Sequence, residues 1–203
     1  MRLPLTAAAA IAIAIVPGPT TSYAKALGSQ ETAILAGGCF WGVEGVFEHV
    51  KGVSSVVSGY AGGPPGRIGG SAEGGSGFAE AVRIRFDPAQ VSYEQLLGIY
   101  FRVAHDPTQV DRQGPDVGPR YRSAIFPQTA EQRRTAADVL ARLRSSRAFA
   151  GPIATKIEGG GFRTAEPEHQ DFVRRHPTSR YVVVNDLPKL EKLRHAYPAM
   201  WKD

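Results

Sequence analysis

The apolar and polar positions of the chain follow two periods, one typical of strands and one typical of helices. Continuous or alternating apolar runs predict strands at 32–36, 53–60, 79–86 and 121–126. Apolar residues spaced at i, i+3, i+4 and i+7 predict helices at 40–50, 92–104, 129–147 and near 165–175. Shorter elements are expected later: a strand at 153–158, a strand or extended segment at 181–184, and a last helical turn or two over 190–197.

The order of these elements predicts a fold class. Strands alternate with helices, but the strands at 53–60 and 79–86 follow one another directly, so a mixed sheet is expected rather than a purely parallel one. Two β-α-β halves predict an α/β (α+β) fold, a two-layer sandwich with a mixed sheet and a ferredoxin-like core. The length of 203 residues suits one domain, which we place at 25–203.

The first 24 residues have the pattern of a cleavable signal peptide. Arg2 supplies a short positive region, 5–16 is almost wholly apolar, and Ser22-Tyr23-Ala24 offers small residues at the −3 and −1 positions of a cleavage site. The apolar run is too short for a comfortable membrane span. We therefore expect a periplasmic or secreted mature chain with no stable membrane insertion.

Charge and histidine content argue against two other classes of function. The formal net charge is +5, but acids and bases are interspersed, and the arginine-rich stretches fall on predicted helices. They are interpreted as solvated faces rather than as a nucleic-acid footprint. The five histidines are scattered without metal-ligand spacing, so no metal site is expected.

Cys39 is the only cysteine, and it falls where the strand at 32–36 gives way to the helix at 40–50. Unpaired N–H groups and the helix dipole at a first turn favour an anion, which predicts a lowered thiol pKa and a reactive thiolate. The alternative is a small buried hydrophobe, as most free cysteines are. The adjoining Phe40 and Trp41 favour reactivity, because packing an inert cysteine does not require two large aromatics.

Two more segments combine polar groups with apolar surroundings. Glu80 begins the largely apolar strand at 79–86, where a carboxyl is either a solvated strand end or, in an apolar pocket, a group that keeps its proton near neutral pH. The loop at 105–118 contains Asp116 and leads to Tyr121, and loops of this length within a domain are usually functional or disordered.

Five segments resemble, in order and spacing, the peptide methionine sulfoxide reductase A family. They are Gly38-Cys39-Phe40-Trp41-Gly42, Gly59-Tyr60-Ala61-Gly62-Gly63, Ala79-Glu80-Ala81-Val82, the loop at 105–118, and Tyr121-Arg122-Ser123-Ala124-Ile125. The match spans roughly 31–176. The family's α/β sandwich on a ferredoxin-like core agrees with the fold predicted above.

The resemblance implies thiol-dependent reduction of methionine S-sulfoxide, free or in proteins, to methionine. Cys39 would attack the sulfoxide sulfur and be left as sulfenic acid. Glu80 matches the general acid and Tyr121 a donor to the sulfoxide oxygen.

Three further positions match the family's substrate-binding groups. Phe40 and Trp41 correspond to the residues that hold the methyl group, and Asp116 to a group that positions the oxygen. No bound cofactor is implied.

The chain departs from the family pattern in ways that bear on the reaction. Many relatives place a second tyrosine in an Asn-Pro-Thr-Tyr stretch after the glycine pair, where this chain has a shorter loop that begins at Pro64, so one oxygen-binding hydroxyl is expected to be missing. Phe78 replaces a histidine. His169 lies in an altered segment and is interpreted as a packing or hydrogen-bonding residue.

A single cysteine leaves no internal thiol to resolve a sulfenic acid. The sequence therefore implies an external thiol reductant, either thioredoxin-like, glutaredoxin-type or small. Two alternatives remain at this stage. A thiol-based hydrolase would need a histidine within reach of Cys39, and a sulfoxide-binding relative would have little turnover.

Overall fold

The computed structural model describes residues 29–63 and 77–203. The predicted signal peptide at 1–24 and most of the loop predicted at 61–77 therefore lie outside the described residues. Within the described part of the chain, no helix is long and apolar enough to cross a membrane.

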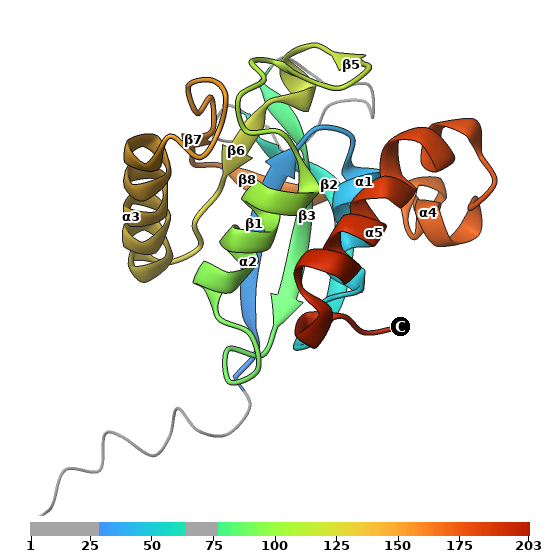
Figure 1. The fold of residues 1–203 in the computed structure, drawn as a ribbon, viewed down its shortest axis with the longest axis horizontal. Helices are drawn as coiled ribbons and strands as arrows, with labels where there is room; N and C mark the ends of the chain where they lie inside the picture. Colours follow the sequence, from blue (N-terminus) through green and yellow to red (C-terminus); the bar gives the residue numbers. More distant parts are fainter. Residues whose placement is uncertain (1–28, 64–76) are drawn as a thin grey trace, which may run out of the picture.

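One six-stranded sheet organises the molecule (Figure 1), with strand order β7-β6-β1-β3-β2-β8. Its strands are β1 (Glu31–Gly37), β2 (Val53–Gly62), β3 (Phe78–Phe86), β6 (Ser123–Ile125), β7 (Lys156–Ile157) and β8 (Gly161–Thr164). The short strands β4 (Arg112–Gln113) and β5 (Asp116–Val117) form a separate hairpin.

The four central strands have the ferredoxin-like arrangement that the sequence predicts. β1 pairs antiparallel with both β3 and β6, and β2 pairs antiparallel with β3. The units β1-α1-β2 and β3-α2-β6 thus interleave in one sheet. β7 joins β6 in parallel, which makes the sheet mixed and confirms the predicted fold class.

Four of the five helices are shorter than predicted, whereas the last one, expected over 190–197, begins earlier and is longer. Turns of π-helix or 3-10 helix adjoin several of them. They are α1 (Phe40–Glu48), α2 (Tyr93–Ile99), α3 (Ala130–Ser146), α4 (Phe172–Arg175) and α5 (Leu187–Ala196). π-Helical turns at Tyr100–Ala104 and Val182–Asp186 and 3-10 turns at Pro119–Tyr121, Pro167–His169 and Pro198–Met200 complete the set. Two helices begin with a capping side chain: the hydroxyls of Ser92 and Thr129 accept from the backbone N–H groups of Gln95 and Gln132.

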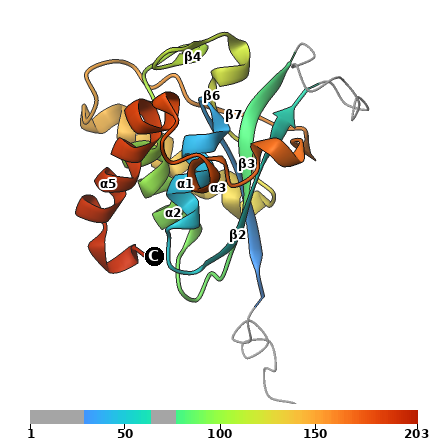
Figure 2. The same ribbon diagram turned by 90° about the vertical axis from the view of Figure 1, so that its right-hand side faces the viewer.

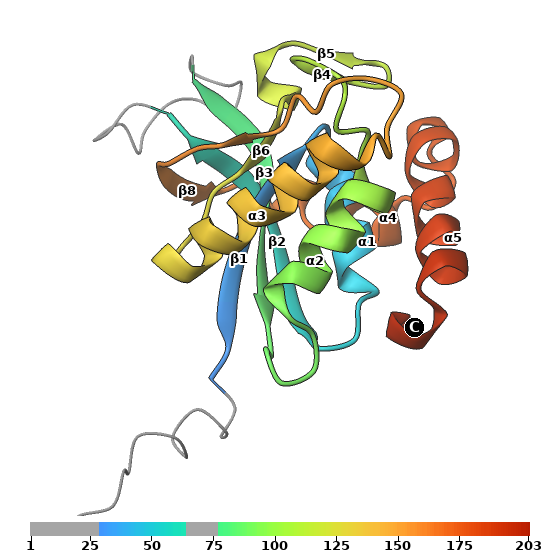
Figure 3. The same cartoon turned by 60° about the vertical axis from the view of Figure 1, so that its left-hand side comes forward.

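The two faces of the sheet differ in how they are covered. On β1, Ala33 and Leu35 face the main core beneath α1, α2 and α3, which lie over one face of the sheet in Figure 3. Ile34 and Ala36 face the other side, where small alanines pack with two phenylalanines in a minor cluster. The alternation along one strand therefore produces a two-layer molecule with one thick core.

The structure corrects four expectations about local elements. Residues 182–186 form a π-helical turn rather than a strand, because only Val182 in that apolar run is buried while Val183 and Val184 are 47 % and 62 % exposed. The strand predicted at 121–126 begins only at Ser123, and the strand at 153–158 shrinks to two residues. The helix near 165–175 is divided at Asp171, whose φ of 53° is left-handed.

The C-terminal segment returns along α1 and is fixed at the far end of that helix. Trp201 forms an isolated antiparallel bridge with Val50 and stacks on His49 at 4.6 Å between ring centroids. Lys51 N–H donates to the Met200 carbonyl at 2.8 Å. Figures 1 and 2 show α5 beside α1, on the helical side of the sheet. This packing brings residues near 181–189 to the N-terminal end of α1.

Candidate active site

Cys39 lies at the junction of β1 and α1, as the sequence predicts. It is the N-cap residue of α1, and Gly38 before it has φ of 92°, a left-handed conformation that suits glycine. A Cβ on Gly38 would meet the side chain of Gln113 at 2.5 Å. The turn is therefore fixed both by its backbone and by the loop that packs on it.

Cys39 is 8 % exposed, and the Trp41 backbone N–H and the Tyr181 hydroxyl lie close to its sulfur. Burial, and after it the charge of Glu80, raises the thiol pKa well above its ordinary value. The expectation of a lowered pKa is therefore wrong for the substrate-free site. Ionisation of the sulfur is favoured when Glu80 is neutral, and by the Trp41 N–H and the Tyr181 hydroxyl, which lower the thiol pKa.

Glu80 projects from β3, opposite Tyr60 of β2, and is buried. Its Oε2 accepts a hydrogen bond from the Phe40 backbone N–H at 3.2 Å. Burial raises the pKa of this carboxyl to about 7, against the opposing effects of the Phe40 N–H and the charge of Arg120. Of the two alternatives left by the sequence, this favours the buried group: the carboxyl is partly protonated at neutral pH and lies next to Cys39.

Tyr121 and Asp116 come from the loop between α2 and β6. Tyr121 ends a 3-10 turn, and its pKa is raised by burial and by the charges of Glu80 and Asp116, so its hydroxyl remains a donor. Asp116 lies on β5 and accepts a hydrogen bond from the Tyr181 hydroxyl. The structure thus brings both predicted residues to the region of Glu80 and Cys39.

The two aromatics after Cys39 are held in fixed orientations. Phe40 is almost fully buried, with its ring edge-on to Tyr60 at 5.7 Å. Trp41 stacks on Phe172 at 3.6 Å with nearly parallel planes, and its indole N–H donates to Nδ1 of His169 at 3.3 Å. The hydrogen-bonding role expected for His169 is confirmed.

Sequence reasoning missed two residues that the C-terminal segment brings to the site. Tyr181 contacts the Cys39 sulfur and Asp116, and its apolar neighbours gave only a strand-like signal. Asp186 is fully buried beside Gly42, where a Cβ would collide with its carboxylate, and it pairs with Lys189 at 3.2 Å. Burial raises the Asp186 pKa, and its charge adds to those that disfavour the thiolate.

A buried polar cluster supports the strand that precedes Cys39. The Tyr100 hydroxyl donates to the Ala36 carbonyl at 2.6 Å and lies 2.9 Å from the Ser123 hydroxyl, which also contacts Nε2 of His105 at 2.7 Å. Burial lowers the pKa of His105 to about 4, so the imidazole is neutral. His105 therefore has a structural role in this buried cluster.

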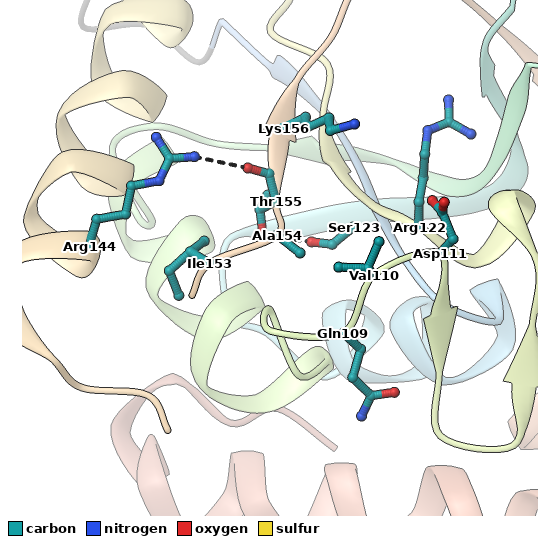
Figure 4. Close-up of a pocket in the computed structure, with 10 residues that line it drawn as sticks. All are labelled: Gln109, Val110, Asp111, Arg122, Ser123, Arg144, Ile153, Ala154, Thr155 and Lys156. Carbon is teal, nitrogen blue, oxygen red and sulfur yellow. Dashed lines mark hydrogen bonds between the residues drawn. The ribbon is translucent and has the colours of Figure 1, made fainter. Parts of the chain in front are cut away.

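Ser123 also lines a cavity of about 310 Å³ beside this cluster (Figure 4). Figure 4 shows the Arg144 guanidinium donating to the Thr155 carbonyl at its edge. The cavity walls contain none of Cys39, Glu80 or Tyr121. It is thus separate from the site of chemistry.

The arrangement has the features of a thiol-dependent redox site. A cysteine stands beside a carboxyl that carries a proton at neutral pH, with tyrosine hydroxyls to bind a polar oxygen and an aromatic pair for an apolar group. His105 and His169, the histidines packed beside this region, direct their nitrogens to Ser123 and Trp41, so the Cys-His geometry of a thiol hydrolase is not favoured.

The family model for peptide methionine sulfoxide reductase matches residues 31–200. The chain belongs to that family. Among curated relatives, peptide methionine sulfoxide reductase MsrA 2 of Mesorhizobium japonicum is 48 % identical over 185 residues, covering 88 % of this chain and 93 % of the relative. The protein of the same name from Synechocystis is 51 % identical over 173 residues, with 82 % and 79 % covered.

Solved structures agree with this assignment. The reduced form of Mxr1 from Saccharomyces cerevisiae superposes with a TM-score of 0.64 at 27 % identity, covering 74 % of this chain and 87 % of that one. Methionine sulfoxide reductase A of Corynebacterium diphtheriae gives 0.62 at 32 % identity, with 75 % and 78 % covered. The ferredoxin-like core is therefore shared with proteins of this class.

Proposed function

We propose that this enzyme reduces methionine S-sulfoxide, free or in proteins, through a sulfenic acid on Cys39. The observation that carries the proposal is the contact between Glu80 and the Phe40 N–H, which holds a carboxyl with a pKa of about 7 next to the reactive sulfur. A sulfoxide needs both groups, because its sulfur accepts a nucleophile and its oxygen must gain a proton before it leaves.

The reaction balances with one thiol and one sulfoxide. The Cys39 sulfur attacks the sulfoxide sulfur, forms an S–S bond and gives up two electrons. The oxygen takes one proton from Glu80 and the proton that Cys39 has lost, and it leaves as water when the substrate S–O bond breaks. A water then attacks the Cys39 sulfur, the S–S bond breaks as the new S–O bond forms, and the proton that this water releases returns to Glu80. Methionine leaves, and Cys39 remains as sulfenic acid, the first step of cysteine oxidation.

Two groups of residues orient the substrate in this mechanism. The Tyr121 hydroxyl donates to the sulfoxide oxygen, and Asp116 positions that oxygen through a water, or directly when its carboxyl is protonated. The ring edges of Phe40 and Trp41 enclose the methyl group, which needs an apolar cleft. Stacking on Phe172 and the bond to His169 keep the indole in place before substrate arrives.

Resolution of the sulfenic acid requires a thiol from another molecule. Cys39 is the only cysteine of the sequence, so no intramolecular disulfide can form. We assign this role to a thioredoxin-like protein, whose dithiol attacks the sulfenic sulfur, releases water and then closes its own disulfide. Two electrons pass to Cys39 in that exchange.

The signal-like pattern at 1–24 supports export of the enzyme to the periplasm or the cell exterior. Export would separate it from cytosolic reductants, so we expect a membrane-linked thiol carrier to supply the electrons. Efficient multiple turnover with a small thiol alone, at a rate equal to that with a thioredoxin-like donor, would contradict this part of the proposal.

A single-turnover experiment tests the function. The protein is incubated with each epimer of a methionine sulfoxide substrate and no reductant, and methionine and a dimedone adduct of Cys39 are measured. We expect about one equivalent of methionine per chain from the S epimer, and none from Cys39→Ser. A binding protein would release no methionine, and a burst that survives in Cys39→Ser would refute Cys39 as the nucleophile.

A further inference from the structure

Tyr181 joins the reacting sulfur to a carboxylate of the site. Its hydroxyl donates to Oδ2 of Asp116 and lies close to the sulfur of Cys39. A hydroxyl carries one proton, so while that proton points to Asp116 the hydroxyl oxygen is free to accept from the thiol S–H. Tyr181 therefore stands between Cys39 and Asp116.

The ring of Tyr181 is held rigidly enough to keep this position. It packs edge-on against Trp41, with centroids 5.6 Å apart and planes at 87°. Val182, directly after it, is fully buried, and the Asn185 amide donates to the Tyr181 carbonyl at 3.0 Å. The π-helical turn that follows thus fixes the hydroxyl over the N-terminus of α1.

The surroundings of the Cys39 sulfur disfavour its ionisation, so a hydrogen-bond donor to the thiolate would assist the reaction. Burial and the charges of Glu80 and Asp186 raise the thiol pKa, whereas the Trp41 backbone N–H and the Tyr181 hydroxyl lower it. The pKa of Tyr181 is itself raised, first by burial, so the phenol stays protonated. The ionisable and charged groups facing this region from the packed elements are Glu80, Asp116, Arg120, Tyr121, Tyr181, Asp186 and Lys189.

We propose that Tyr181 is a further catalytic residue, whose hydroxyl passes the thiol proton of Cys39 to Asp116 and then donates a hydrogen bond to the thiolate. In this step the S–H bond breaks as an O–H bond forms on Tyr181, and the original Tyr181 O–H bond breaks as one forms on Asp116. The proton on Asp116 then faces the sulfoxide oxygen. The inference rests on the proposed function, because it assigns a role within that reaction.

The test compares Tyr181→Phe with Tyr93→Phe. Both changes remove one hydroxyl and keep the ring, but Tyr93 lies at the start of α2, where its buried hydroxyl has no hydrogen-bond partner among the described residues. Two quantities are measured: the single-turnover rate of methionine formation, and the pH dependence of Cys39 alkylation by iodoacetamide, which reports the single thiol directly.

We expect Tyr181→Phe to slow the single turnover about 100-fold, as loss of one oriented donor does in other enzymes, and to move the alkylation profile to higher pH. Tyr93→Phe should leave both unchanged. An unchanged alkylation profile in Tyr181→Phe would overturn the inference, whether or not the rate falls. If the wild-type chain gives no methionine burst, the proposed function fails, while the alkylation profiles still decide whether Tyr181 stabilises the thiolate.

Discussion

The carboxylate of Glu80 accepts a hydrogen bond from the backbone N–H of Phe40, the residue directly after Cys39. N–H groups in the first turn of a helix usually bond the side chain of the N-cap residue, but Cys39 holds that position and makes no such bond. A carboxyl from the neighbouring strand takes its place. The same contact therefore completes the start of α1 and sets the Glu80 carboxyl beside Cys39.

This contact predicts a pH dependence for the first step of the reaction. Burial raises the Glu80 pKa to about 7, and only the protonated carboxyl can act as the acid. We expect the contribution of Glu80 to be complete below pH 6 and to be lost as the pH rises through about 7. Single-turnover rates between pH 5.5 and 8.5, in steps of about half a pH unit, measure this.

Glu80→Gln should slow methionine formation about 100-fold at neutral pH and remove the fall near pH 7. Substrate affinity should change little, since the amide keeps the size of the carboxyl. Glu94→Gln is the matched control, because Glu94 lies on the surface and pairs with Arg142 far from the site. A Glu80→Gln enzyme with the wild-type rate and profile would exclude Glu80 as the acid.

Tyr121→Phe tests the donor to the sulfoxide oxygen. The variant keeps the half-buried ring, so the expected effect is a fall in single-turnover rate of about 10²-fold with little change in the substrate concentration at half-saturation. Tyr197→Phe, at the end of α5, should retain the wild-type rate. An effect on half-saturation alone would mean that Tyr121 binds substrate without assisting the chemistry.

Gly42 leaves room for the buried Asp186 carboxylate, which predicts that Gly42→Ala displaces the C-terminal segment. The added methyl would collide with Asp186 and lie 2.6 Å from Nζ of Lys189. We expect lower thermal stability and a slower single turnover.

Gly98→Ala provides the contrast, since its methyl would meet only the Tyr197 hydroxyl at 3.7 Å. In the helix α2 it should stabilise the protein by about 0.5–1 kcal/mol. Thermal unfolding of both variants measures the difference. Equal melting temperatures for Gly42→Ala and Gly98→Ala would show that the C-terminal segment moves away from residue 42 without loss of stability.

Tyr100→Phe should destabilise the fold without touching the site. Its hydroxyl donates to the Ala36 carbonyl and contacts Ser123, so its removal leaves buried polar atoms unpaired at a cost of about 1–3 kcal/mol. Tyr93→Phe removes a buried hydroxyl that makes no such bonds and should be close to neutral. Urea unfolding of the two variants gives the comparison, and equal midpoints would contradict it.

The core of the fold and most of the site could be predicted because their signals are local. The apolar run before Cys39 and the helical spacing after it place the nucleophile at a strand-to-helix turn, and the two strands at 53–60 and 79–86 predict the antiparallel pair that carries Glu80. For Glu80 the sequence left two alternatives, a solvated strand end or a carboxyl with a raised pKa, and the burial of its side chain favours the second.

The thiol pKa and the C-terminal segment could not be predicted in the same way. Helix position alone suggests a lowered Cys39 pKa, but burial and nearby carboxyls depend on tertiary packing. The run at 181–184 has strand-like residues, yet the packing of Val182 and Asp186 against α1 imposes a helical turn. Contacts between distant parts of the chain, such as that of Asp186 with Gly42, leave no periodic pattern in the sequence.

The bridge between Trp201 and Val50 has a consequence for how each catalytic cycle must finish. The end of the chain is tied down at one side of α1, while Asp186 and Lys189 anchor it at the other. A C-terminal segment held at both of these points does not move across the site to reduce an oxidised Cys39. The electron donor is therefore a separate molecule, which reaches Cys39 with this segment in place.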